Sequence, residues 1–176
     1  MAILTWYGHS CFSLDLGHGG SVVFDPYSPG SVPGVELPKG LKADLVLCSH
    51  QHGDHNAAGR VKLTGRKPAF RLTLLGSLHD PDKGAKRGLN QIAVVEYEGF
   101  RAVHLGDLGC ALNRDQIDTL RKADLLMLPV GGFFTIGPDE AADICEQLQP
   151  RVIVPMHYRR GKMGFDVLMT LDDFTG

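Results

Sequence analysis

The stretch Ser49-His50-Gln51-His52-Gly53-Asp54-His55 decides how the rest of the chain is interpreted. It follows the apolar run 45–48, which is typical of a buried strand, and it precedes residues 56–58, which we expect to begin a helix. Alternate side chains of an extended segment share a face, so His50 and His52 point the same way. Asp54 and His55 then enter a first helical turn, where side-chain direction changes within one residue. The stretch can therefore offer two imidazoles to one metal ion, and a carboxylate with an imidazole to a second.

Length and composition favour one globular domain, which we place over residues 1–176. With 43% apolar and 22% charged residues, the chain can build a core of its own. The net charge of −2 gives no electrostatic reason to expect nucleic acid or a membrane surface as a partner. The four cysteines form no C-x-x-C pair, and the first residues show no signal peptide. We therefore expect a cytoplasmic protein with free thiols and a small-molecule substrate, and a homo-oligomer is compatible with the sequence.

Strand-like segments fill the first half of the chain, and strands alternate with helices in the second half. We expect strands over 3–7, 11–16, 21–24, 45–48, 69–75, 92–97, 100–105, 125–130 and 151–156. One helix should run from the cap Asn113 to about Lys122, and another from Pro138 to about Leu148. Residues 26–40 and 80–90 should form loops around a pocket. The pattern predicts a single α/β domain.

Further ligand-type side chains recur just past the carboxyl ends of the expected strands. His79, Asp107 and His157 each occupy such a position, as His50 does. Ligands of open α/β sheets gather at that edge. The expected assignment is His50, His52 and His79 for one ion, Asp54, His55 and His157 for the other, and Asp107 as the bridge. Imidazole and carboxylate suit two divalent ions, zinc first, with manganese and iron as alternatives.

These residues resemble the signature of the metallo-β-lactamase superfamily, most of whose members are metal-dependent hydrolases. The superfamily's His-x-His-x-Asp-His motif corresponds to His50, His52, Asp54 and His55, and its later ligands correspond to His79, Asp107 and His157. The resemblance implies a four-layer αββα sandwich with the metals at one sheet edge. Because the sequence ends at Gly176, we expect a final covering helix to be short or absent.

Shorter stretches resemble a narrower branch, the small bacterial proteins related to ascorbate-phosphate lactonases. The stretches are Trp6-Tyr7-Gly8-His9-Ser10, Phe24-Asp25-Pro26, His104-Leu105-Gly106-Asp107-Leu108-Gly109, Pro129-Val130-Gly131-Gly132 and Pro155-Met156-His157-Tyr158. Many members of that branch are known only as metal-dependent hydrolases. The resemblance therefore implies a reaction type but no substrate.

The remaining polar candidates each have two interpretations. His9 either makes a structural hydrogen bond or supports a ligand. Asp25 either orients a ligand imidazole, which usually donates its second N–H to such a group, or forms an Asp-Pro turn. The strand period places His104 on the face opposite Asp107, which favours a core or ligand-supporting histidine over a ligand. His18 is expected in solvent.

The expected chemistry is hydrolysis by a metal-activated hydroxide. Metal binding lowers the pKa of water from about 15.7 to about 7, so no side-chain nucleophile is needed. No G-x-S-x-G motif offers one. Asp54 is the expected catalytic residue, which orients the attacking water or accepts its proton. We therefore expect a hydrolase of a small-molecule ester, lactone or amide.

Two other functions stay open. Hydrolysis of phosphodiesters or phosphorylated substrates is one, because Arg87 and Arg159 could form a rim that binds an anion, although they are also typical solvated loop charges. A non-hydrolytic di-metal redox or sensor protein is the other. His52 stands where di-iron relatives of the superfamily typically carry glutamate, which favours hydrolysis over redox chemistry.

Overall fold

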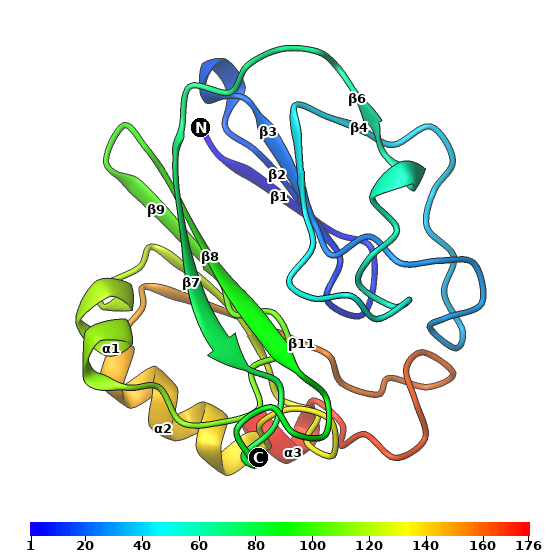
Figure 1. Ribbon diagram of the computed structural model, residues 1–176, viewed down its shortest axis with the longest axis vertical. Coiled ribbons are helices and arrows are strands. Elements are labelled where there is room, and N and C mark those ends of the chain that lie inside the picture. Colours follow the sequence, from blue (N-terminus) through cyan, green and yellow to red (C-terminus); the bar gives the residue numbers. More distant parts are fainter.

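Two β-sheets face each other in the computed structural model, which describes residues 1–176 (Figure 1). The first sheet has the order β1-β2-β3-β5. Its strands are β1 (Ile3–Trp6), β2 (Phe12–Asp15), β3 (Ser21–Phe24) and β5 (Leu45–Leu47). Neighbours are antiparallel except for the parallel pair β3 and β5. The short strands β4 (Lys42–Ala43) and β6 (Lys62–Leu63) pair in a separate two-stranded sheet.

The second sheet has the order β11-β10-β9-β8-β7. Its strands are β7 (Arg71–Leu78), β8 (Leu89–Tyr97), β9 (Phe100–His104), β10 (Leu125–Pro129) and β11 (Val152–Met156). Strands β7, β8 and β9 pair antiparallel, whereas β9, β10 and β11 run parallel. Parallel strands need crossover connections, and the helices α1 (Arg114–Leu120) and α2 (Pro138–Leu148) supply them.

The inner strands of the second sheet are buried on both faces, because alternate side chains enter different cores. In β8, Ile92 and Val94 pack in the cluster beneath α1 and α2, whereas Ala93 and Val95 pack against the first sheet. Strand β10 divides in the same way, with Leu126 on one side and Met127 on the other. A two-residue period produces this division, and it explains why these strands are almost continuously apolar in sequence.

Both longer helices begin where the sequence predicts. The Asn113 side chain accepts from the Gln116 backbone N–H, and the Gln116 side chain accepts from the Asn113 N–H, so the two form a capping box. Pro138 is the first residue of α2, and Glu140 accepts from the Gly137 N–H. These caps place both helices against the second sheet, where their apolar residues are buried.

The two outer layers of the sandwich differ. Helices α1 and α2 lie on the second sheet, and α3 (Asp172–Thr175) is a single short turn, as expected for the final helix (Figure 1). The outer face of the first sheet is covered by the loop 26–40 instead, whose Tyr27, Val32 and Leu37 pack with Val23 of β3. The sheet-and-helix order follows the sandwich expected from the sequence, with one outer layer built mainly from a loop.

The prediction that an α-helix begins at residue 56 is wrong. Only the 3₁₀ turn η2 (Ala58–Arg60) forms before β6 begins at Lys62. Too few residues separate the ligand stretch from β6 to offset the cost of nucleating an α-helix. The expected strands are present, and β7 and β8 are longer than predicted because they pair along their whole lengths. No helix combines the length and the apolar character that a membrane span requires.

Candidate metal centre

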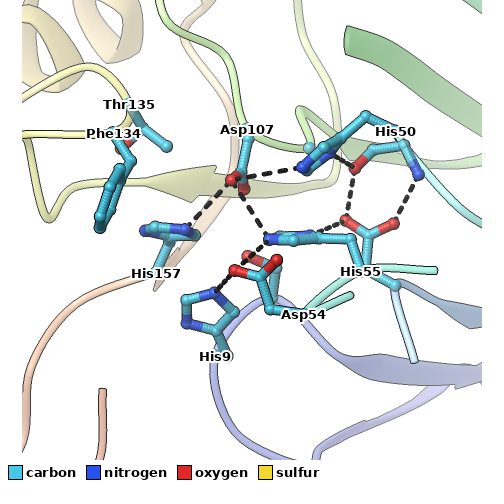
Figure 2. Close-up of polar contacts among 12 residues, drawn as sticks. His9, His50, Asp54, His55, Asp107, Phe134, Thr135 and His157 are labelled. Carbon is cyan, nitrogen blue, oxygen red and sulfur yellow. Dashed lines mark hydrogen bonds and ion pairs between the residues drawn. The ribbon is translucent and has the colours of Figure 1, made fainter. Parts of the chain in front are cut away.

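The ligand-type residues predicted from the sequence lie in loops that follow four different strands. His50, His52, Asp54 and His55 follow β5, His79 follows β7, Asp107 follows β9, and His157 follows β11. Strands of both sheets therefore deliver side chains to one region, which Figure 2 shows in close-up. Except for His52 and Asp54, these side chains are buried.

One carboxylate oxygen lies at the centre of the group. Asp107 Oδ2 is 3.1 Å from His157 Nε2 and 3.2 Å from His55 Nε2 (Figure 2). It is also 3.3 Å from His79 Nε2. His50 Nε2 is slightly farther away, at 3.9 Å. Four imidazole nitrogens thus lie within 3.9 Å of a single carboxylate oxygen.

The same atoms form two adjoining groups, within each of which the ligand atoms lie no more than 4.8 Å apart. The first contains His50, His52 and His79, and the second contains His9, Asp54, His55 and His157. A third set, His50, His55 and Asp107, overlaps with both. The structure therefore groups six of the predicted ligands in the two expected sets and adds His9 to the second. Asp107, the seventh, is grouped with one histidine from each set.

Asp25 orients two of the imidazoles. It directly follows β3 and is buried, and its Oδ2 accepts from His55 Nδ1 at 2.8 Å and from the Ser49 hydroxyl at 2.7 Å. The Ser49 oxygen in turn accepts from His50 Nδ1 at 3.0 Å. The Nδ1 of each imidazole is thereby held by a partner, and its Nε2 is directed toward Asp107. These hydrogen bonds correspond to the interpretation in which Asp25 orients predicted ligand imidazoles.

Backbone and amide groups hold two further ligands. His79 Nδ1 donates to the Phe134 carbonyl at 3.2 Å, which leaves its Nε2 toward Asp107. The Asp107 backbone N–H donates to Asn90 Oδ1 at 2.9 Å, and Asn90 Nδ2 donates to the Leu105 carbonyl. The loop after β9 is therefore tied to β8 through one buried amide.

His9 supports the second group from the opposite side. Its side chain is fully buried, and its Nε2 lies 3.3 Å from Asp54 Oδ2 (Figure 2). Its carbonyl accepts from Trp6 Nε1 and from the His157 backbone N–H, so it connects β1 to the loop after β11. His9 thus contacts one predicted ligand through its ring and a second through its backbone.

The electrostatics of the centre favour neutral imidazoles beside ionised carboxylates. Burial and the neighbouring His55 lower the pKa of His50 to about 4, and burial beside His157 lowers that of His9 to about 3. Burial alone would raise the pKa of Asp107, but the surrounding imidazoles hold it well below its ordinary value. His55 is different, because its two carboxylate neighbours, Asp107 and Asp25, outweigh burial and raise its pKa well above the ordinary value.

The polar atoms left without partners fit a divalent cation. Nε2 of His50, Nε2 of His55 and Oδ1 of Asp107 are buried and make no hydrogen bond. Buried polar atoms are normally paired, because an unpaired one costs about 1–3 kcal/mol. Imidazole nitrogens and a carboxylate oxygen that converge without hydrogen-bond partners form the donor set that zinc, manganese or iron takes.

Three glycines allow the ligand loops to approach one another closely. A Cβ atom built on Gly109 would lie 2.3 Å from the His79 carbonyl carbon, and one on Gly131 would lie 2.0 Å from the His157 carbonyl oxygen. A Cβ on Gly106 would lie 2.5 Å from Ser49 Cβ. Gly109 and Gly131 therefore bring ligand loops into direct backbone contact, and Gly106 makes room for the Ser49 side chain.

A cavity of about 420 Å³ opens beside the centre. Asp54 and Arg87 line it, together with the phenyl rings of Phe134 and Phe165. Arg159 does not line it, because its Nε donates to the Leu168 carbonyl. Among the residues predicted to bind substrate, the structure therefore places Arg87 at the cavity and Arg159 outside it.

His104 and His18 lie away from the predicted ligands. His104 packs between the sheets, where its ring stacks on Phe24 at 4.9 Å and its Nε2 donates to the Ser10 carbonyl. His18 is exposed in the turn after β2. His104 is thus a core histidine, which is the interpretation that the strand period favoured.

Sequence reasoning did not identify Ser49, Asn90 or Phe134 as supports of the centre. Ser49 adjoins the ligand motif, so it carried some signal, whereas the burial of Asn90 becomes apparent only in the structure. Phe134 contributes through its carbonyl, and no side-chain pattern could have revealed that contact.

The chain is similar to known proteins over most of its length. Residues 3–157 match the family model of the β-lactamase superfamily domain. A metal-dependent hydrolase of Korarchaeum cryptofilum is 32% identical over 196 residues, covering 90% of this chain and 84% of the relative. Another, from Thermococcus onnurineus, is 30% identical over 192 residues, covering 90% of this chain and 85% of the relative.

Solved structures give the same result. A protein of the metallo-β-lactamase superfamily from Thermotoga maritima superimposes with a TM-score of 0.75 and 36% identity, covering 98% of this chain and 83% of its own. A metallo hydrolase from Ignicoccus hospitalis superimposes with a TM-score of 0.67 at 20% identity, covering 96% of this chain and 86% of its own. The second likeness supports the fold alone.

Proposed function

The chain belongs to the metallo-β-lactamase superfamily and is a metal-dependent hydrolase, and from this premise we propose that it uses two divalent ions, zinc first, to hydrolyse an ester, lactone or amide of a small molecule. The fold of the superfamily is confirmed by the structural neighbours. The reaction type follows from the family, whereas the number of ions and the substrate are inferred from the residues of the centre.

The observation that carries the proposal is the set of buried ligand-type atoms around Asp107 that have no hydrogen-bond partner. The Nε2 atoms of His50 and His55 and Oδ1 of Asp107 have no hydrogen-bond partner. Two adjoining groups of three or four ligands are more than one ion needs, because a catalytic site usually supplies three protein ligands per ion. We assign His50, His52 and His79 to one ion, Asp54, His55 and His157 to the other, and Asp107 to both.

When bound, such ions supply Lewis acidity and an activated water at neutral pH. The chain's own part is to hold the ligands in position and to manage the proton. Asp25 and Ser49 fix the imidazoles of His55 and His50, and Phe134 fixes that of His79. Ligands held in one tautomer by such partners bind metal more tightly than free imidazoles do.

Asp54 is the residue we assign to the attacking water. Its side chain is 19% exposed and lines the cavity, whereas most ligands are almost fully buried. Burial would raise its pKa, but the contact with His9 and the nearby His55 hold the pKa below its ordinary range, so the group is a carboxylate. Oδ2 faces His9, which leaves Oδ1 to accept a hydrogen bond from water and to take its proton.

The cavity favours a small substrate. Its volume of about 420 Å³ lies within the range usual for small-molecule sites. Its walls combine the ligands with two phenyl rings and one guanidinium, so a substrate would place its reacting carbonyl at the ligand wall and its apolar part against Phe134 and Phe165.

The direct test is to remove the metal, reload the protein with zinc, manganese or iron, and measure bound ions per chain beside activity on a panel of esters, lactones, amides and phosphodiesters. We expect about two ions per chain and hydrolysis of at least one ester, lactone or amide. His55→Ala should lose bound metal and activity, whereas His18→Ala, which alters an exposed histidine, should keep both. One ion in the active protein, or inactivity on the whole panel, would refute the proposal.

A further inference from the structure

Arg87 is the one cationic side chain, histidines aside, among the residues that line the cavity beside the metal centre. The other lining groups are predicted ligands, small residues and the rings of Phe134 and Phe165. A single fixed positive charge in such a cavity selects among ligands, because a guanidinium binds a carboxylate or phosphate through two parallel hydrogen bonds.

The guanidinium is held in place but is not neutralised. It lies over the Phe134 ring, with its central carbon 5.5 Å from the ring centroid. Its side chain makes no hydrogen bond or ion pair with another residue, whereas the neighbouring Lys86 pairs with Asp82. Stacking on an aromatic face orients a guanidinium and leaves its N–H groups available. Arg87 is therefore available to bind an anion.

The backbone of Arg87 is fixed by a buried carboxylate. Asp80 is fully buried and accepts from the backbone N–H groups of Asp82, Gly84, Lys86 and Arg87, the last at 2.8 Å. The next residue, Gly88, accepts from the His79 N–H through its carbonyl. The loop after β7 is thus closed at both ends, which places Arg87 at a set position relative to the ligand His79.

Phe134 contacts both the ligand His79 and the Arg87 guanidinium. Its carbonyl accepts from His79 Nδ1, and its ring supports the Arg87 guanidinium. One residue therefore positions both a metal ligand and the cation. This arrangement gives an anion bound at Arg87 a defined position relative to the reacting carbonyl at the centre.

We propose that Arg87 determines substrate specificity, and that the substrate is a small ester, lactone or amide that carries an anionic group bound by this guanidinium. The inference rests on the proposed hydrolase function. The anion is a carboxylate or a phosphate, both of which match the planar fork. The apolar part of the substrate lies against the rings of Phe134 and Phe165, between the anion and the reacting bond.

The kinetic test compares two esters of matched length, mono(4-nitrophenyl) succinate and 4-nitrophenyl butyrate, which differ by one carboxylate. In the metal-loaded Arg87→Gln variant we expect kcat/KM for the succinate ester to fall about 10- to 100-fold, since a hydrogen bond to a charged group is lost. The kcat/KM for the butyrate ester should change less than twofold. For the succinate ester, the kcat/KM of Arg87→Lys should lie between those of wild type and Arg87→Gln. Lys86→Gln is the matched control, because Lys86 is the adjacent cation and does not line the cavity. Equal losses for both esters in Arg87→Gln would overturn the proposal.

A binding test separates this proposal from the hydrolase proposal. Phenyl phosphate and phenylacetate are titrated calorimetrically into metal-loaded wild type, Arg87→Gln and Lys86→Gln. We expect at least one anion to bind wild type and Lys86→Gln, and to bind Arg87→Gln about tenfold or more weakly. Loss confined to phenyl phosphate assigns a phosphate, and loss confined to phenylacetate assigns a carboxylate. If neither anion binds the wild type, or if binding is unaffected by Arg87→Gln, the inference is overturned even if the enzyme hydrolyses neutral esters. Inactivity toward every ester with Arg87-dependent binding intact would count against the hydrolase proposal alone.

Discussion

Replacing Asp25 by asparagine should weaken metal binding although residue 25 touches no metal. The carboxylate accepts from the Ser49 N–H at 2.6 Å, from the Ser49 hydroxyl at 2.7 Å and from His55 Nδ1 at 2.8 Å. In Asp25→Asn one oxygen remains for the backbone N–H, and an NH₂ group faces the hydroxyl and the imidazole, which are both donors. His55 and His50 then lose the partner that fixes their tautomers.

The expected size of the effect is a 10- to 100-fold loss of metal affinity, which is typical when such a partner is removed. At about 1.4 kcal/mol per tenfold, this corresponds to roughly 1.4–2.7 kcal/mol of binding free energy. Asparagine is the right replacement because Asp25 has a φ of 44°, a left-handed conformation that asparagine tolerates well. The backbone should therefore keep its shape in the variant.

Competition between the protein and a chromogenic zinc chelator measures the affinity, and elemental analysis gives the bound metal. Asp44→Asn is the matched control. Asp44 is also a carboxylate that accepts from a serine N–H and hydroxyl, those of Ser21, but it is not among the grouped ligands or their partners. Wild-type zinc affinity in Asp25→Asn, or an equal loss in both variants, would refute the reasoning that Asp25 acts through the imidazoles.

Two further predictions concern buried groups outside the ligand set. Burial lowers the pKa of His104 below its unfolded value of about 6.5. Below that pH, the unfolded chain therefore binds a proton that the native protein excludes. The free energy of unfolding then falls as the pH falls toward the native pKa, by up to about 1.4 kcal/mol per pH unit. Urea unfolding of metal-free protein between pH 5 and 7 should therefore show a shallower pH slope in His104→Leu than in wild type, and parallel slopes would contradict the assignment. Asp80→Asn should loosen the loop after β7, because an NH₂ group replaces an oxygen that accepts from the Lys86 and Arg87 N–H groups. Trypsin should then cleave within residues 83–87 about tenfold faster than in wild type, whereas an unchanged cleavage rate would show that the carboxylate does not hold the loop.

The sequence predicted the ligand set better than it predicted the supports of that set. His50 to His55 were recognisable because histidine and aspartate recur at short spacing after an apolar run, and His79, Asp107 and His157 because each follows a strand. Their supports depend on tertiary contacts that leave little trace in sequence. His79 receives its partner from a carbonyl 55 residues away, and any residue type at position 134 carries that group.

Layers and loops show the same contrast. The paired strands and the two capped helices follow from period and from cap residues, which are local signals. The covering of the first sheet was predicted less well, since the segment after His55 is too short to form an α-helix and a loop rich in proline and glycine packs there instead. Arg87 and Arg159 look alike as loop cations in sequence. Only the turn centred on Asp80 and the ring of Phe134 distinguish the cation at the cavity from the one that is bound elsewhere.

The close approach of Gly109 to the His79 backbone and of Gly131 to that of His157 limits how the enzyme can be redesigned. In a saturation library, both positions should reject even alanine, although neither glycine lines the cavity. New specificity must then come from residues such as Ser31 and Phe165, which line the cavity on separate loops. Changes in specificity should therefore arise from substitutions in the cavity wall, while the glycine contacts keep the ligand geometry constant.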